Sequence, residues 1–318
     1  MDQPPRLLSS LRTELRTRHY SYSTEEAYVG WIRRYVHFSG LRHPRELGPD
    51  DARAFLNDLA ERRRVSASTQ TQALSALLFL YRHVLRMEMG WLEGLVRARA
   101  PSRLPVVLAR EQVGAVLDQL DGVPRMVAML LYGSGLRLME AHRLRVKDVE
   151  FEKGQVVVRR GKGAKDRVTM LPKAIGGRLR EHLERGRPDF ERDVAEGVRV
   201  PMPDALERKK PGASQSWAWW WVFPASRRYA PDGHASWRMY LHPTVTQKAV
   251  VAAARRAGMT QRVTCHAFRH SFATHLLESG YDIRTVQELL GHRSVETTMI
   301  YTHVLNKGGL GVRSPLDV

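Results

Sequence analysis

The sequence of 318 residues contains a single cysteine, Cys265, so no disulfide can form within the chain. This composition is typical of a reducing cytoplasm, where we expect the protein to be located. No run approaches the roughly eighteen consecutive apolar residues of a membrane-spanning helix. Residues 1–20 also lack the apolar core of a secretory signal. These absences disfavour membrane proteins and disulfide-rich secreted proteins.

Acidic residues are few relative to basic ones. There are 33 Asp and Glu against 51 Lys and Arg, which gives a formal charge of +18 and a pI near 10.5. Such a chain attracts polyanions, and nucleic acid is the leading candidate. A membrane surface or ribosomal RNA is the alternative, but no basic amphipathic stretch stands apart from the rest. With 43% hydrophobic residues, the chain is long enough for two domains with separate cores.

Residues from about 8 to 92 have the apolar spacing of helices. The segment "STEEAYVGWIRRYVHFSG" carries Ser23 as a predicted N-cap, Glu26 at the capping-box position and Gly40 at its end. Further helical segments follow, so residues 1–96 are predicted to form a small helical bundle. Its arginines lie mostly off the apolar stripe, which fits either a solvated face or a DNA-contacting face.

Residues 97–105, within "RARAPSRLP", contain two prolines and no periodicity, and we interpret them as an interdomain linker. Residues 106–318 are then a second domain. It begins with helices and continues with the hairpin "GQVVVRRGKGAKDRVTML". A long irregular stretch is predicted at 185–245, and helices from 244 to about 305. The expected fold class is mainly α with a small antiparallel β-sheet.

Several residues near the C-terminal end are suited to chemistry on an anion. In "CHAFRHSFATHLLESG", His266 and Arg269 are three residues apart and can project from one helix face. The next helix is predicted to begin at the cap Asp282 and to end at Gly291. His292 follows that end, and Tyr301 lies on a short element capped by Ser294. A phenol on such an element can be aimed at a ligand.

A second group lies upstream. Arg137 follows a glycine-rich turn, Glu140 is three residues further on, and Lys162 occupies the turn of the predicted hairpin. The sequence "GKG" lacks the spacing of a P-loop, so ATP use is not indicated. A free phenol has a pKa of about 10 and needs cationic neighbours to act as a nucleophile. Two arginines can hold a phosphate in bidentate fashion, so the two groups together predict phosphoryl transfer by a tyrosine.

Four ordered motifs carry a family resemblance: "GSGLRLMEAHRLRVKDV", "GKGAKDRV", "HAFRHSFATHLLESG" and "LLGHRSVETTMIYTHV". Together they resemble the tyrosine recombinases, the phage integrase family, over most of residues 105–305. The resemblance implies DNA strand cleavage and rejoining through a 3′-phosphotyrosyl intermediate, without a cofactor or a metal. It implies the catalytic residues Arg137, Lys162, His266, Arg269, His292 and Tyr301, with Glu140 in support and Lys162 as general acid to the leaving 5′ oxygen.

A narrower likeness is to the integron integrases. It rests on an aromatic and basic insertion at about 190–240, which includes "PDALERKKPGASQSWAWWWVFP", and on the tail "YTHVLNKGGLGVRSPLD". In that subfamily the insertion binds folded single-stranded sites by holding protruding bases, and aromatic faces suit this use. The candidate DNA-binding residues are Trp219, foremost, and Trp220, Trp221, Arg238 and His242. The segment "SWRMYLHP" departs from the subfamily pattern, because two adjacent histidines are expected there.

Three alternatives stay open at this point. The tryptophan run can be a hydrophobic plug beneath a long loop. His266 and His270 have the i, i+4 spacing of a zinc helix, although no glutamate base lies between them and Arg269 would repel a cation. The third alternative is a DNA-binding regulator that has kept the fold but does not catalyse a reaction.

By analogy with the family, the N-terminal helical core-binding bundle and the mixed α/β catalytic domain are expected to form a C-shaped clamp on DNA. Recombination joins two sites. Synapsis is therefore expected to need a tetramer, with the C-terminal tail bridging neighbouring protomers. The expected partners are duplex DNA and folded single-stranded recombination sites.

Overall fold

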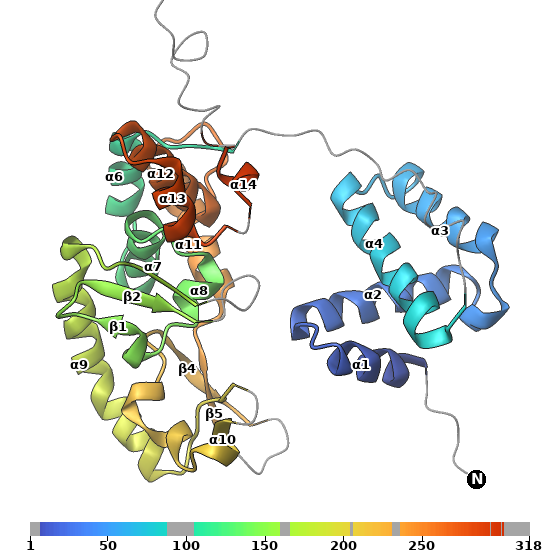
Figure 1. Cartoon of the computed structure of the whole chain (residues 1–318), viewed down its shortest axis with the longest axis horizontal. Coiled ribbons are helices and arrows are strands. Elements are labelled where there is room, and N and C mark those ends of the chain that lie inside the picture. Colours follow the sequence, from blue (N-terminus) through green and yellow to red (C-terminus); the bar gives the residue numbers. More distant parts are fainter. Residues whose placement is uncertain are drawn as a thin grey trace, which may run out of the picture. The chain divides into compact units, whose positions relative to one another are not determined.

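The computed structural model describes residues 7–87, 105–159, 166–203, 206–230, 236–292, 294–299 and 301. The chain divides into two compact units, Met1–Arg103 and Leu104–Val318, here called the N-terminal and C-terminal units (Figure 1). Across the described ranges, no helix combines the length and the apolar character needed to cross a membrane. The fold is mainly helical with small antiparallel sheets, which confirms the predicted fold class.

The N-terminal unit is a bundle of helices. Its elements are α1 (Leu7–Thr17), α2 (Tyr22–Phe38), η1 (Pro44–Glu46), α3 (Pro49–Glu61), α4 (Ala67–Phe79) and η2 (Leu80–Leu85). The N-cap of α2 is Ser21 and not Ser23, because the Ser21 hydroxyl accepts a hydrogen bond from the Thr24 amide. In the core, the hydroxyls of Tyr35 and Tyr81 are 3.0 Å apart, so both phenols are satisfied despite burial.

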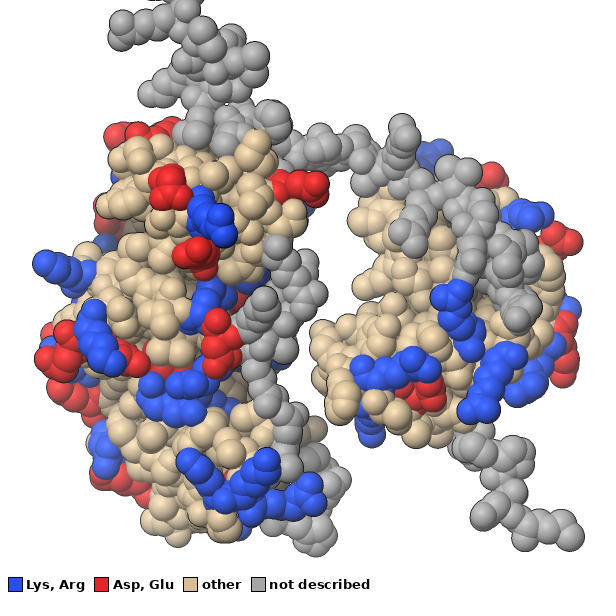
Figure 2. Space-filling model, in the orientation of Figure 1, with Lys and Arg blue, Asp and Glu red and all other residues tan. Residues whose placement is uncertain are grey.

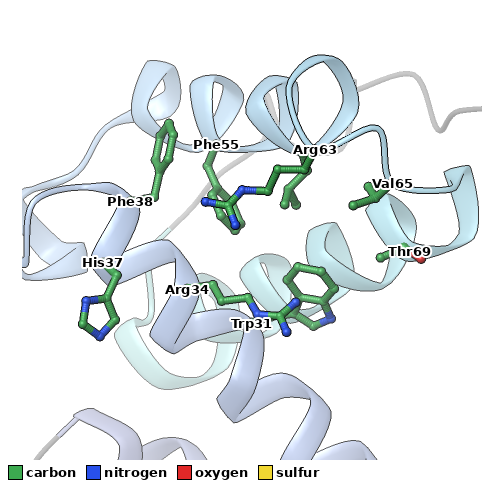
Figure 3. A pocket seen from close by; sticks show the side chains of 9 residues that line it. Trp31, Arg34, His37, Phe38, Phe55, Arg63, Val65 and Thr69 are labelled. Atoms are coloured by element: carbon green, nitrogen blue, oxygen red, sulfur yellow. The ribbon is translucent and has the colours of Figure 1, made fainter.

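A pocket of about 360 Å³ lies in this unit between α2, α3 and the start of α4 (Figure 3). Trp31, Phe55 and Leu59 form its apolar floor, and all three are buried. Arg34 and Arg63 lie at its edge, and the Arg34 guanidinium sits 4.7 Å from the centre of the Trp31 ring. The pocket therefore combines an aromatic floor with a cationic edge.

The C-terminal unit combines helices with two small sheets. Its helices are α6 (Arg110–Asp118), α7 (Gly122–Gly133), α8 (Leu138–His142), α9 (Lys173–Ala195), α10 (Leu206–Lys209), α11 (Pro243–Arg256), α12 (Cys265–Glu278), α13 (Ile283–Leu290) and α14 (Glu296–Met299). Short turns of 3₁₀-helix are η3 (Val146–Asp148), η4 (Ala213–Gln215) and η5 (Trp217–Trp219). α7 packs against α12 and α11 and brings the buried residues of all three into one core.

The first sheet has the strand order β1 (Val149–Glu150), β2 (Gln155–Val158) and β3 (Arg167–Met170), all antiparallel. Val156 pairs with Thr169, and Val158 pairs with Arg167 at the end nearest the hairpin turn. The predicted hairpin is therefore present as β2 and β3. Its turn, residues 160–165 with Lys162, lies outside the described residues.

The stretch 185–245 is more regular than the sequence predicts. α9 continues to Ala195 with Pro188 inside it, and a second antiparallel sheet forms from β4 (Pro224–Tyr229) and β5 (Trp237–Tyr240). Asp193, 1% exposed, accepts from the Arg238 guanidinium at 2.6 and 2.7 Å. This ion pair ties the last turns of α9 to β5. Figure 2 shows basic side chains gathering toward the end of the C-terminal unit that carries α10 and this sheet.

Gly135, in the turn between α7 and α8, requires a glycine. Its φ is +62°, and a Cβ there would lie 2.4 Å from the Phe272 ring of α12. The turn thus approaches α12 more closely than any side chain allows.

We predict that Gly135→Ala lowers the free energy of unfolding by about 2–4 kcal/mol, through overpacking and the left-handed backbone. Gly176→Ala is the matched control, because Gly176 lies within α9 with open space around its Cα. It should raise stability by about 0.5–1 kcal/mol. Urea denaturation of both variants measures the contrast, and equal effects would contradict the close approach at Gly135.

Candidate active site

The site is built around Glu140 in the first turn of α8. Arg137 is the N-cap of this helix, and its amide and its Nη1 each donate to the Glu140 carboxylate at 2.8 Å. The side chains of Arg137 and Glu140 are 21% and 11% exposed. Because Arg137 and Glu140 are three residues apart, their side chains meet at the start of α8, and this contact fixes the direction of the Arg137 side chain.

Arg167, the first residue of β3, grips the same carboxylate from the other side. Its Nη1 and Nη2 donate to the two Glu140 oxygens at 3.0 and 2.7 Å, and its Nε donates to the Leu289 carbonyl at 2.9 Å. Burial raises the pKa of Glu140, but the hydrogen bonds and charge of Arg167, with those of Arg137, outweigh it and lower the pKa to about 2. The sequence analysis did not predict Arg167 as a site residue, although this arginine lies within the motif "GKGAKDRV".

Arg269 of α12 is 3% exposed and completes the cationic centre. It donates to the Gly135 carbonyl, to the Leu290 carbonyl at 2.7 Å and to His292 Nε2 at 3.1 Å. Its Nη1 is 3.9 Å from the Glu140 carboxylate. Burial, and then the charge of Arg137, lower the pKa of Arg269 to about 9, so the guanidinium stays charged at neutral pH.

His292 follows the end of α13 at Gly291. A guanidinium can only donate, so His292 Nε2 accepts from Arg269 and Nδ1 carries the proton. That proton is donated to the Thr298 hydroxyl of α14, 3.0 Å away. Burial, and then the charges of Arg269 and Arg137, lower the pKa of His292 to about 3. The ring is therefore neutral and held in one tautomer.

Tyr301 lies just beyond α14 and is 3% exposed. Its ring stacks on His292, with the centroids 6.2 Å apart and the planes 17° from parallel. Its hydroxyl is 3.0 Å from His270 Nδ1. Burial raises the pKa of Tyr301, while Arg269 and Arg137 act in the opposite direction. The phenol is therefore protonated at neutral pH and lies within the field of two guanidinium groups.

His266 opens α12 one turn before His270, and the two rings meet edge to face with centroids 5.5 Å apart. Partial burial and the charges of Arg269 and Arg137 lower the pKa of His266. The structure thus brings Arg137, Glu140, Arg269, His292 and Tyr301 into one network, with His266 beside it. Lys162 lies outside the described residues. Over the described part of the chain, no three His, Cys, Asp or Glu side chains are placed to hold a metal ion.

Trp219, at the end of η5, is partly exposed. The Lys147 ammonium lies 3.2 Å from the centre of its ring, and the Arg145 guanidinium lies 5.9 Å from it. The Lys147 ammonium makes the surroundings of the indole attractive to a nucleic acid, whereas Arg145 is 8% exposed and donates to the Trp219 and Pro201 carbonyls.

Trp220 and Trp221 occupy different positions from Trp219. They are 2% and 5% exposed and belong to a cluster with Phe190 and Val200. The Trp221 indole N–H donates to the Arg238 carbonyl at 2.8 Å. As packed here, neither ring presents a face to a base, so the predicted DNA contact by these two residues requires correction. The plug interpretation describes them better.

Arg238 also differs from the expected arrangement. Arg238 is 8% exposed, and its guanidinium is engaged by Asp193 and by the Ala225 and Ser226 carbonyls. These contacts give the Arg238 side chain a structural role, which corrects the prediction that it contacts DNA. His242 is exposed and is the N-cap of α11, where its Nδ1 accepts from the Thr244 amide at 3.4 Å.

Several known proteins and two family profiles are similar to this chain in sequence. The profile of the phage integrase family matches residues 107–307, and that of its N-terminal SAM-like domain matches residues 7–91. Two proteins named Integrase/recombinase, from Escherichia coli and Pseudomonas aeruginosa, are 50% identical to this chain over 98% of its length and 93% of theirs. Tyrosine recombinase XerA of Thermococcus kodakarensis is 33% identical, over 96% of this chain and 93% of its own.

Solved structures share the fold. The XerH site-specific recombinase bound to palindromic difH substrate matches with a TM-score of 0.61 and 21% identity, over 95% of this chain and 82% of its own. A lambda integrase (75–356) dimer bound to a COC′ core site matches with a TM-score of 0.62 and 15% identity, over 93% of each chain. At these identities the likeness concerns the fold alone.

We predict that Glu140→Gln destabilises the C-terminal unit in a pH-dependent manner. The pKa of Glu140 is about 2 against an ordinary value of 4.5. The carboxylate therefore contributes stability above pH 4.5, and this contribution is lost as the pH falls through about 2. The loss should be on the order of 3 kcal/mol at pH 7 and should shrink toward pH 2.

Chemical denaturation at pH 7, 5 and 3 measures this difference. Glu288→Gln, at an exposed position on α13, is the matched control and should change little at any pH. A Glu140→Gln effect that does not vary with pH would contradict the ion pairs assigned to this carboxylate.

Proposed function

Because this chain belongs to the phage integrase family and is a site-specific tyrosine recombinase, we propose that it is of the integron integrase type. In this proposal it inserts and excises gene cassettes, and its sites are folded single strands with protruding bases. The chemistry and the choice of DNA rest on different parts of the C-terminal unit and are tested separately.

In the proposed reaction, the Tyr301 oxygen attacks a backbone phosphorus and displaces the 5′ oxygen, leaving a 3′-phosphotyrosyl ester. Arg137 and Arg269 hold the non-bridging oxygens and stabilise charge on the pentacoordinate state. Lys162 protonates the leaving 5′ oxygen, His266 hydrogen-bonds the phosphate, and His292 orients Arg269 and the Tyr301 ring. The ester conserves the energy of the phosphodiester, so a second 5′ hydroxyl can reverse the step without ATP, a metal or a cofactor.

One observation carries this mechanism. The phenol of Tyr301 lies stacked on His292, and His292 accepts from Arg269, so the proposed nucleophile belongs to the same bonded network as an arginine of the phosphate site. The charges of Arg269 and Arg137 act to lower the pKa of Tyr301, against the larger effect of burial. In this proposal a phosphate held by both arginines is the group that the phenol attacks.

The proposed preference for protruding bases is supported by Trp219. Its indole is partly exposed and has the Lys147 ammonium 3.2 Å from the centre of its ring, whereas Trp220 and Trp221 anchor the insertion from within. A base without a pairing partner can stack on such a ring, while Lys147 attracts an adjoining phosphate. In a regular duplex the bases stack on one another and offer no face to the ring.

For the assembly, we propose that residues 1–96 and 106–318, joined by the linker 97–105, clamp DNA from two sides in a C shape. Four protomers then bring two sites together, with the C-terminal tail bridging neighbours. DNA as the partner is supported by the solved structures of similar fold, XerH bound to palindromic difH substrate and a lambda integrase dimer bound to a COC′ core site. The proposed location is the bacterial cytoplasm, with the nucleoid.

We predict that Tyr301→Phe abolishes the covalent protein–DNA adduct while DNA binding is retained, because only the nucleophilic oxygen is lost. The test incubates the protein with a hairpin bearing protruding bases and separates the products on a denaturing gel. Tyr281→Phe, at a position 56% exposed, is the control and should form adduct normally. A regulator without catalysis would form no adduct with either protein.

We predict that Trp219→Ala weakens binding to the hairpin by about 5- to 150-fold, which corresponds to roughly 1–3 kcal/mol per stacked base. Binding to a matched duplex should be unchanged. Tyr229→Ala removes another exposed aromatic ring of the insertion, on β4, and is the matched control. Equal losses on hairpin and duplex would argue against base stacking at Trp219.

A further inference from the structure

The hydroxyl of Tyr301 is hydrogen-bonded to His270, a histidine that the family resemblance does not include among the catalytic residues. His270 follows Arg269 on α12, and its Nδ1 is 3.0 Å from the Tyr301 oxygen. The centroids of the two rings are 5.5 Å apart, and the ring planes are inclined by 50°. His270 therefore contacts the atom that forms the new bond in the proposed reaction.

We propose that His270 is a catalytic residue of strand cleavage, whose Nδ1 accepts the hydrogen bond of the Tyr301 hydroxyl and takes its proton as the oxygen bonds to phosphorus. The proposal rests on the assignment of Tyr301 as the nucleophile. It extends that assignment by naming the group that activates the phenol.

The other imidazole in contact with Tyr301 cannot take this proton. His292 lies against the face of the Tyr301 ring, its Nε2 accepts from Arg269, and its Nδ1–H is donated to Thr298. Both of its nitrogens are therefore occupied. His266 meets His270 edge to face, and its contact in the site is with that ring. Among the described histidines, His270 is the one with a nitrogen directed at the phenol oxygen.

The surroundings of His270 keep it ready to accept a proton. Burial, and then the proximity of His266 and Arg269, lower its pKa to about 4, so the ring is neutral at neutral pH. With Nδ1 accepting, the single ring proton resides on Nε2. A phosphate bound by Arg137 and Arg269 brings negative charge to the site, which favours the imidazolium. The arrival of DNA thus strengthens the base at the moment it is needed.

The cleavage step balances with this assignment. The Tyr301 oxygen forms its bond to phosphorus while its proton passes to His270 Nδ1, and the ring becomes an imidazolium. The bond between phosphorus and the 5′ oxygen breaks, and the leaving oxygen takes a proton from Lys162, the donor proposed above. In rejoining, the incoming 5′ hydroxyl forms its bond to the phosphorus of the phosphotyrosyl ester and gives its proton back to Lys162. The bond between phosphorus and the Tyr301 oxygen breaks, and the proton on His270 returns to that oxygen.

A second His–Tyr pair on the same helix provides a matched control. His275 Nδ1 is 2.9 Å from the Tyr132 hydroxyl, and the two rings meet edge to face with centroids 5.7 Å apart. The largest electrostatic influences on Tyr132 come from Arg110 and not from the site arginines. This pair has the same hydrogen bond as His270 and Tyr301 but no proposed part in the chemistry. Changing it therefore measures the purely structural effect of losing an imidazole from α12.

The test compares His270→Asn with His275→Asn in the full-length protein. The Asn oxygen can replace Nδ1 as an acceptor but cannot take a proton. The DNA is the hairpin or the duplex on which the wild-type protein forms adduct, prepared with either oxygen or sulfur at the bridging 5′ position. Sulfur leaves without protonation, so the sulfur substrate removes the need for the acid and leaves the need for the base.

We expect His270→Asn to slow adduct formation about 100-fold or more on both substrates, in the range of a lost general base. Lys162→Ala should be slow on the oxygen substrate and restored by sulfur. His275→Asn should cleave at the wild-type rate. A rate for His270→Asn within about threefold of wild type, or its restoration by sulfur, would overturn the role of His270 while the recombinase activity stands. Absence of adduct with the wild-type protein on both DNAs would instead overturn the proposed function, and the role of His270 with it.

Nitrogen-15 NMR of labelled histidine in the free protein tests the same hydrogen bond without DNA. We expect His270 at pH 7 to be neutral, with the proton on Nε2, and its Nδ1 signal to shift in Tyr301→Phe. A proton on Nδ1, or a charged ring, would overturn the proposal whatever the DNA substrate.

Discussion

One carboxylate holds the cationic centre of the C-terminal unit together. Glu140 receives the guanidinium groups of Arg137 and Arg167, and Arg269 lies just beyond hydrogen-bond distance. Three buried or half-buried cations would repel one another, and a single anion offsets only part of that repulsion. The surplus positive charge is what a phosphate diester can neutralise. Glu140 therefore both permits the cluster to fold and leaves it attractive to DNA.

The same cluster ties together parts of the chain that are distant in sequence. Arg167 reaches from β3 to the Leu289 carbonyl at the end of α13, and Arg137 reaches from α8 to the Gly291 carbonyl. The carbonyl end of a helix carries partial negative charge, so it is a natural acceptor for these donors. His292 and α14 follow directly, and their positions depend on this connection. Tyr301 is thus oriented by contacts that begin at Glu140.

Local patterns in the sequence predicted the elements well and the long-range contacts poorly. Asp282 and Gly291 bound α13 as expected, because capping is decided within a few residues. Arg167 and His270 were missed as site residues because their partners, Glu140 and Tyr301, lie 27 and 31 residues away. The spacing of residues along the sequence does not reveal a hydrogen bond between segments that come together only in the folded chain.

The insertion shows the same division between local pattern and fold. A run of three tryptophans indicates an aromatic surface, but it does not tell which indole faces outward. The packing of Trp220 and Trp221 against α9 decides that question, and α9 itself extends through Pro188, where the sequence predicts irregular structure.

The arginines of the site have backbone carbonyls as hydrogen-bond acceptors. Arg269 is matched by the carbonyls of Gly135 and Leu290, and Arg137 by that of Gly291. In the proposed reaction, a scissile phosphate held by Arg137 and Arg269 competes with these carbonyl oxygens, so its capture exchanges one set of hydrogen-bond acceptors for another. An exchange of this kind runs in either direction with little bias. A protein that rejoins the strands it cleaves must release the phosphate as readily as it binds it.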